Sequence, residues 1–166
     1  MPVIPALVCP IAILYVYLSF LICFFSIPSA GIMMRVEIQE GMIRMQRLPR
    51  TRDHKATVAT TLRLAGGVSM GELQIEEEKR PQRVLFGDSW FASVSTVLAL
   101  QDKYGVHFTG PIKMGSGGFP LDEMRWQLSL MERGEHIVLQ LEGKKIWAVG
   151  WHDHCFKYYI TTHGKL

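Results

Sequence analysis

Asp88 stands at the position where a carboxylate is best placed to do chemistry. It follows the apolar residues 84–86, whose strand propensity and lack of polar alternation are typical of a strand buried on both faces. Residues 87–89 have turn character, and Ser93 is a good N-cap for a helix that begins at Val94. In open α/β sheets, ligands and catalytic groups gather at this end of a strand. Asp88 therefore has two interpretations: a turn residue, or an oxygen ligand for a divalent metal ion.

Three other segments contain residue types that can bind ions or phosphate. Residues 152–155 are His-Asp-His-Cys, but neighbouring residues of an extended chain point to opposite sides, so we interpret them as a structural turn. Residues 76–78 are consecutive Glu, which suit a solvated linker better than a shared coordination shell. The glycine-rich residues 115–118 lack a following Gly-Lys-Ser/Thr, so we expect a mobile turn and no phosphate loop.

The expected elements alternate between strands and helices, which indicates an α/β domain. The first helix should stop at the pair Gly66-Gly67, and Trp126 should pack inward from the last helix. One of the two aromatic residues Trp90 and Phe91 should be buried beneath the helix that follows Asp88. We expect strands at residues 34–39, 84–86 and 106–110, helices at 57–64, 94–104 and 121–131, and a β-meander over 136–141, 145–151 and 156–161.

The N-terminus differs abruptly from the rest of the chain. Residues 1–34 contain no charged side chain, and residues 3–27 are apolar almost throughout. As a helix they would span about 37 Å, against about 30 Å of bilayer hydrocarbon. We therefore expect residues 1–31 to be a signal peptide or membrane anchor ahead of a domain at residues 32–166. Packing as a strand or helix against the domain's own sheet is a further alternative.

The net charge and the cysteine content exclude few classes of function. The net charge of +3 and the pI of 8.8 permit a nucleic-acid partner without requiring one. Residues 46–55 are strongly basic, and either a solvated loop or a contact with a phosphate backbone would explain them. The three cysteines form no disulfide framework, which is typical of a reduced domain.

Residues 88–93, Asp-Ser-Trp-Phe-Ala-Ser, closely resemble the Asp-Asn-Phe-Phe-Thr-Ser block of piggyBac-type transposases. In that family the Asp is the second of three catalytic carboxylates. Similar segments follow the family order at residues 36–41, 104–112, 118–120, 148–153 and 158–162. The resemblance implies an α/β, ribonuclease H-like domain that cuts and rejoins DNA in the nucleus. It also implies that Asp88 is a catalytic ligand for Mg²⁺ or Mn²⁺.

The same resemblance implies an incomplete enzyme. In the family the first strand carries the first catalytic Asp, but residues 1–31 contain neither Asp nor Glu, and the Gly-Val-Asp context of the third does not occur. We therefore expect a truncated, inactive domain that lacks its first strand and its end, with Asp88 binding metal only if the other carboxylates are supplied. Exposed sheet edges along the gap would favour self-association. The alternative function is a small α/β binding protein, either membrane-anchored or secreted.

Overall fold

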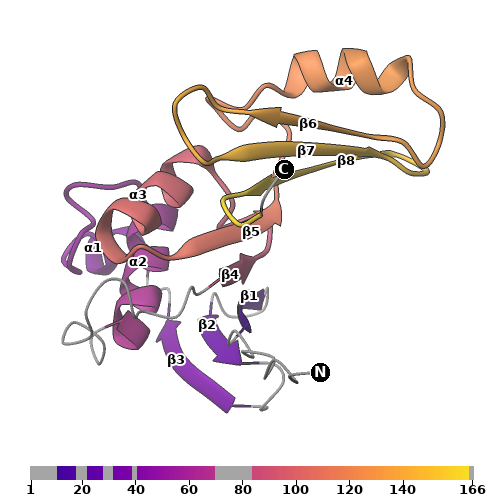
Figure 1. Cartoon of the computed structure of the whole chain (residues 1–166). Helices are drawn as coiled ribbons and strands as arrows, with labels where there is room; N and C mark the ends of the chain where they lie inside the picture. Colours follow the sequence, from indigo (N-terminus) through magenta and orange to yellow (C-terminus); the bar gives the residue numbers. More distant parts are fainter. Residues whose placement is uncertain (1–10, 18–21, 28–31, 39–40, 70–83, 165–166) are drawn as a thin grey trace, which may run out of the picture.

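A mixed sheet of eight strands runs through the whole molecule, in the order β3-β2-β1-β4-β5-β8-β7-β6 (Figure 1). The structure is a computed structural model that describes residues 11–17, 22–27, 32–38, 41–69 and 84–164. The strands are β1 (Ile11–Tyr17), β2 (Ile22–Ile27), β3 (Ile32–Ile38), β4 (Val84–Gly87), β5 (His107–Pro111), β6 (His136–Gln140), β7 (Trp147–His152) and β8 (Phe156–Thr161). The helices are α1 (Gly41–Met45), α2 (Ala56–Ser69), α3 (Val94–Tyr104) and α4 (Leu121–Ser129). The α/β class is therefore confirmed.

The prediction of a gap in the sheet is wrong, and the alternative that N-terminal residues pack as a strand against the domain's own sheet is confirmed. Residues 11–17 form β1, which pairs in parallel with β4 and antiparallel with β2. β2 in turn pairs with β3, which corresponds to the strand expected at residues 34–39. Apolar residues rich in Ile, Val, Tyr and Phe favour strands as well as membrane helices, and here the place beside β4 is available to them. The sheet is continuous from β3 to β6, so the expected gap and its two unpaired edges do not exist.

The N-terminal residues therefore belong in part to the same sheet as the rest of the chain. β1 and β2 lie within the segment that we expected to be a signal peptide or membrane anchor. None of the helices in the described ranges is long and apolar enough to cross a bilayer. The transmembrane helix expected at residues 3–27 is not supported. Whether residues 1–31 act as a signal stays a prediction.

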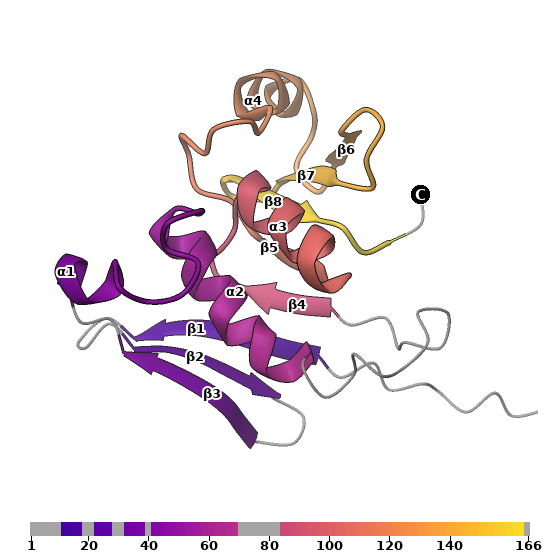
Figure 2. The same ribbon diagram turned by 90° about the vertical axis from the view of Figure 1, so that its left-hand side faces the viewer.

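Helices α2 and α3 lie side by side across one face of the strands (Figure 2). α3 begins as predicted, because the Ser93 hydroxyl accepts a hydrogen bond from the backbone N–H of Thr96 at 3.1 Å. α2 does not stop at Gly66-Gly67 but continues to Ser69. Gly66 serves helix packing and does not end the helix. A Cβ at Gly66 would lie 2.7 Å from the Tyr104 hydroxyl, so glycine permits the close approach of the two helices.

The C-terminal strands form the expected antiparallel meander, and α4 packs against them. Met124 and Leu128 of α4 are fully buried, and they fill the space above Gly150 of β7. Trp126 lies on the opposite side of the helix and is 60% exposed, so the prediction that it packs inward is wrong. The turns at Gly115 and Gly118 have positive φ angles of 81° and 77°, consistent with the predicted glycine-rich turn.

Candidate functional site

Asp88 lies where the sequence predicts it, directly after the last residue of β4. Its side chain is half-buried, and Oδ1 accepts a hydrogen bond from the backbone N–H of Trp90 at 2.7 Å. Its backbone carbonyl accepts hydrogen bonds from the N–H groups of Phe91 and Ala92, at 3.1 and 3.2 Å. This arrangement is an Asx-turn, in which the carboxylate holds the chain as it leaves the strand. Among the described residues, Oδ2 has no hydrogen-bond partner.

The two aromatic residues after Asp88 differ in burial, as expected. Phe91 is completely buried, while Trp90 is half-buried, and the two rings meet edge to face with centroids 4.8 Å apart. Phe91 therefore fixes the turn to the core from below, and Trp90 covers it nearer the surface. The sequence identified this pair correctly because an aromatic residue between a buried strand and a capped helix has the core directly beneath it.

A close approach of β4 and β5 also shapes the site, and no sequence pattern predicts it. A Cβ at Gly110 would lie 2.5 Å from the backbone oxygen of Gly87, and one at Gly87 would lie 2.7 Å from the ring of Phe108. Both glycines are buried. The Phe108 ring therefore packs closely over both glycines, which fixes the end of β4 from which Asp88 projects.

The register of β1 shows what lies beside Asp88 in the sheet. Leu14 is the partner of Gly87, so the following residue, Tyr15, comes level with Asp88. β1 contains no Asp or Glu, and the first carboxylate of the chain is Glu37, near the end of β3. Within the part of the chain that the structure describes, no group of three His, Cys, Asp or Glu could hold a metal ion. These residues do not fit a site for two divalent ions held by three carboxylates.

The other sequence candidates are not brought to Asp88. Residues 153–155 form the bend between β7 and β8, where Arg133 pairs with Asp153 at 3.3 Å. Hydrogen bonds, first from the backbone of His154 and then from Arg133, hold the pKa of Asp153 below its usual value. Both partners of this ion pair are solvent-accessible, which is typical of a structural turn. The three glutamates at residues 76–78 lie outside the described residues.

We call the basic residues 46–55 the basic turn. Contacts made by Arg63 and Arg50 hold this turn in a defined structure that the sequence did not predict. Buried Arg63 of α2 binds both oxygens of Glu37 at 2.6 and 2.8 Å and donates to the carbonyl of Pro49 at 2.9 Å. Arg50 donates to the Leu62 carbonyl at 3.1 Å and to the Tyr104 hydroxyl. Its guanidinium also lies over the Tyr104 ring, 5.1 Å from the centroid. Tyr104 lies 54 residues from Arg50 in the chain, so no local sequence pattern predicts their contact.

Comparison with solved structures relates this arrangement to a known fold. The chain is similar to a piggyBac transposase in its synaptic complex with hairpin DNA, with a TM-score of 0.72 over 95% of this chain. Its fold is similar to that of a transposase. Sequence identity is 12%, so the likeness shows the fold alone, and this chain spans about a third (34%) of that transposase chain. No family model matches the sequence, and no curated protein matches it.

The resemblance noted in the sequence is thus confirmed at the level of the fold. The five strands from β3 to β5, with α2 and α3, position Asp88 at the end of a central strand. A catalytic or metal-binding role for Asp88 stays a prediction, as do the nuclear location and the ion, Mg²⁺ or Mn²⁺.

Proposed function

We propose that this protein is a piggyBac transposase-derived domain of the ribonuclease H-like type, which binds DNA without cutting it. A ribonuclease H-like sheet has its first strand near the middle, and β1 lies between β2 and β4 here. The similarity to a transposase that is bound to hairpin DNA supports DNA as the partner. The domain would then have kept the architecture of the family and lost its chemistry.

One observation carries this proposal: β1 lies where a ribonuclease H-like sheet would have its first strand, but it has no carboxylate. β1 pairs with β4 in the register that brings Tyr15 level with Asp88, and Ile11–Tyr17 contains only uncharged residues. Two-metal phosphoryl transfer requires acidic ligands on both sides of the ions. Asp88 alone cannot organise such a site, and one of its oxygens already serves the turn. We therefore assign Asp88 a structural role in this chain.

Titration of the protein with Mn²⁺, followed by the electron paramagnetic resonance signal of the free ion, tests this assignment. We expect no stoichiometric binding in the micromolar range, and the same titration curve for Asp88→Asn. Asp102 on the exposed surface of α3 provides the matched control, as Asp102→Asn. Tight binding of two ions per chain that is lost in Asp88→Asn and kept in Asp102→Asn would refute the proposal.

The alternative function, a membrane-anchored or secreted binding protein, gains no support from the described residues. It depended on residues 1–31 forming a separate apolar segment, whereas β1 and β2 are interior strands of the sheet, each paired on both sides. Removing them for insertion into a bilayer would separate β3 from β4. We therefore favour the DNA-binding function.

A further inference from the structure

The basic turn, residues 46–55, accounts for the whole net charge of the chain. It contains four Lys or Arg residues and one Asp, an excess of three positive charges. The complete chain has 18 Lys or Arg and 15 Asp or Glu, which is also an excess of three. The rest of the protein is therefore neutral overall. A polyanion would be attracted to this turn more strongly than to the rest of the chain.

The turn is held in one conformation. Arg50 has a φ of 70°, a left-handed conformation that is unfavourable for a residue with a side chain. Its contacts with Leu62 and Tyr104 maintain that conformation. On the other side, the Thr51 hydroxyl donates to the carbonyls of Met45 and Leu48, each at 3.0 Å. A charge run that served only for solubility would need none of these contacts, and strain of this kind often marks a functional segment.

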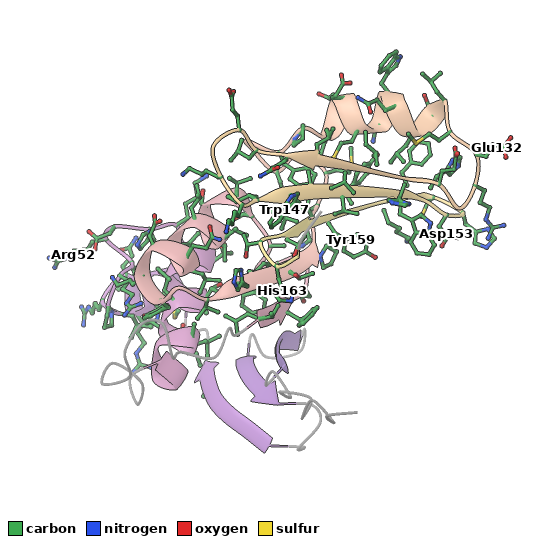
Figure 3. The ribbon with its side chains drawn as sticks, in the orientation of Figure 1. Arg52, Glu132, Trp147, Asp153, Tyr159 and His163 are labelled. Carbon is green, nitrogen blue, oxygen red and sulfur yellow. The ribbon has the colours of Figure 1, made fainter. Side chains whose placement is uncertain are left out.

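The cations that are not used as anchors point to solvent. Arg47, Arg52 and Lys55 are exposed, and within the described residues none of them has a carboxylate partner. Arg52 projects away from the body of the molecule (Figure 3). Lys55 immediately precedes α2, whose first turn contains no acidic residue, so the positive end of the helix dipole adds to the same potential. Asp53 is the one opposing charge in the turn.

We propose that the basic turn is a docking site for the sugar-phosphate backbone of duplex DNA, with Arg47, Arg52 and Lys55 each neutralising a phosphate. The proposal rests on the proposed function for the choice of DNA as the polyanion. Three exposed cations lie within nine residues of one short, anchored segment, so a single stretch of backbone phosphates can meet all of them. Contacts of this kind position a protein on DNA without reading its sequence. Binding at the turn is therefore independent of the DNA sequence and sensitive to salt.

The salt dependence of DNA binding provides the test. The affinity of the full chain for a fluorescent 20-base-pair duplex is measured at several NaCl concentrations, in EDTA so that no metal-dependent step occurs. The slope of log K against log [salt] is negative, and the triple variant Arg47→Gln/Arg52→Gln/Lys55→Gln should make it shallower by about 2.7, because each phosphate contact contributes about 0.9 to its magnitude. The matched control Lys113→Gln/Lys144→Gln/Lys145→Gln removes the same charge from exposed positions elsewhere and should change the slope by less than about 0.5.

The salt dependence of the two triple variants separates a specific docking site from a general effect of charge. Equal slopes for the wild type and the basic-turn variant would overturn the docking site while leaving the proposed function intact. Equal losses in both triple variants would also overturn it, because the effect would then be one of net charge. Absence of DNA binding by the wild type would instead contradict the proposed function. Polyglutamate that competes as well as unlabelled DNA would show a general anion surface and would refute the assignment to DNA. If the triple variant fails to melt cooperatively, Arg52→Gln alone should make the slope shallower by about 0.9.

Discussion

At the scale of single residues, burial at the turn after β4 decides the outcome of substitution. Phe91 is fully buried and packs edge to face on Trp90. Phe91→Ala should lower the free energy of unfolding by about 3–5 kcal/mol, because it removes a ring from a close-packed core and leaves a cavity. Urea denaturation measures this change. The matched control is Trp126→Ala on the exposed face of α4, which should change the value by less than about 1 kcal/mol. Similar effects at the two positions would contradict the burial that we describe.

His107 gives the protein a pH dependence at the scale of one residue. Burial is the main cause that lowers its pKa from 6.5; the Thr162 carbonyl, which accepts a hydrogen bond at 2.7 Å, opposes this effect. The nearby His163 and Lys145 lower the pKa further. Because the unfolded chain takes up a proton more readily than the folded one, stability should fall as the pH drops below 6.5.

Thermal melts between about pH 7.5 and pH 5 test this effect. The melting temperature of the wild type should decrease over this range, and His107→Gln should show a smaller decrease. His136→Gln, at an exposed histidine, should keep the wild-type decrease. An unchanged pH dependence in His107→Gln would show that other groups are responsible.

Several residue-level features could be predicted from the sequence because their causes are local. Ser93 caps α3 through its own hydroxyl, and Asp88 closes its own turn. Trp126 could not be placed correctly, because the buried face of α4 depends on which side of the helix the meander covers. The anchoring of Arg50 by Tyr104, 54 residues away, could not be predicted for the same reason.

At the scale of elements, the contact between α2 and α3 depends on a glycine that the sequence suggested as a helix stop. Replacing glycine by alanine within a helix ordinarily stabilises it by up to about 1 kcal/mol. Gly66→Ala should instead destabilise the protein by about 1–3 kcal/mol, because the new Cβ would lie 2.7 Å from a Tyr104 hydroxyl that Arg50 and Leu62 hold in place. Denaturant midpoints measure the change.

The double variant Gly66→Ala/Tyr104→Phe isolates the cause. Without the hydroxyl, the nearest atom of the ring lies 3.5 Å from the added Cβ, an ordinary contact. Gly66→Ala should therefore cost less in the Tyr104→Phe background than in the wild type. Equal costs in the two backgrounds would show that the helices can separate freely, and that Gly66 is not needed for their packing.

The elements themselves were largely predictable, and the exceptions have physical reasons. Alternation and turn chemistry located β3, β4, β5 and the meander within a few residues. We expected residues 1–31 to be a signal peptide or anchor, with a strand only as an alternative, because an apolar run has no periodicity that separates a buried strand from a membrane helix. Only the pairing of β1 with β4 resolves the ambiguity, and that pairing joins residues about 70 positions apart.

At the scale of the whole molecule, β1 and β2 join β3 to the other five strands of the sheet. Deletion of residues 1–31 removes both strands. β3 then loses its neighbour β2, and β4 loses its neighbour β1. We expect the truncated protein to aggregate or to lose cooperative melting, because β4 would expose an unpaired edge. Deletion of residues 1–9, which removes no residue of β1 or β2, is the control and should melt like the full chain. Size-exclusion chromatography and calorimetry in detergent-free buffer distinguish the outcomes, and a monomeric, cooperatively melting truncation would contradict this role of β1.

We propose that a transposase-like fold has kept DNA binding and lost DNA cleavage. One reaction tests both parts: a labelled duplex is incubated with the full chain and Mg²⁺ or Mn²⁺, and the products are run on a native gel and on a denaturing gel. We expect a shifted complex on the native gel and an intact strand on the denaturing gel, for the wild type and for Asp88→Ala alike. Cleaved product from the wild type that disappears in Asp88→Ala would contradict it.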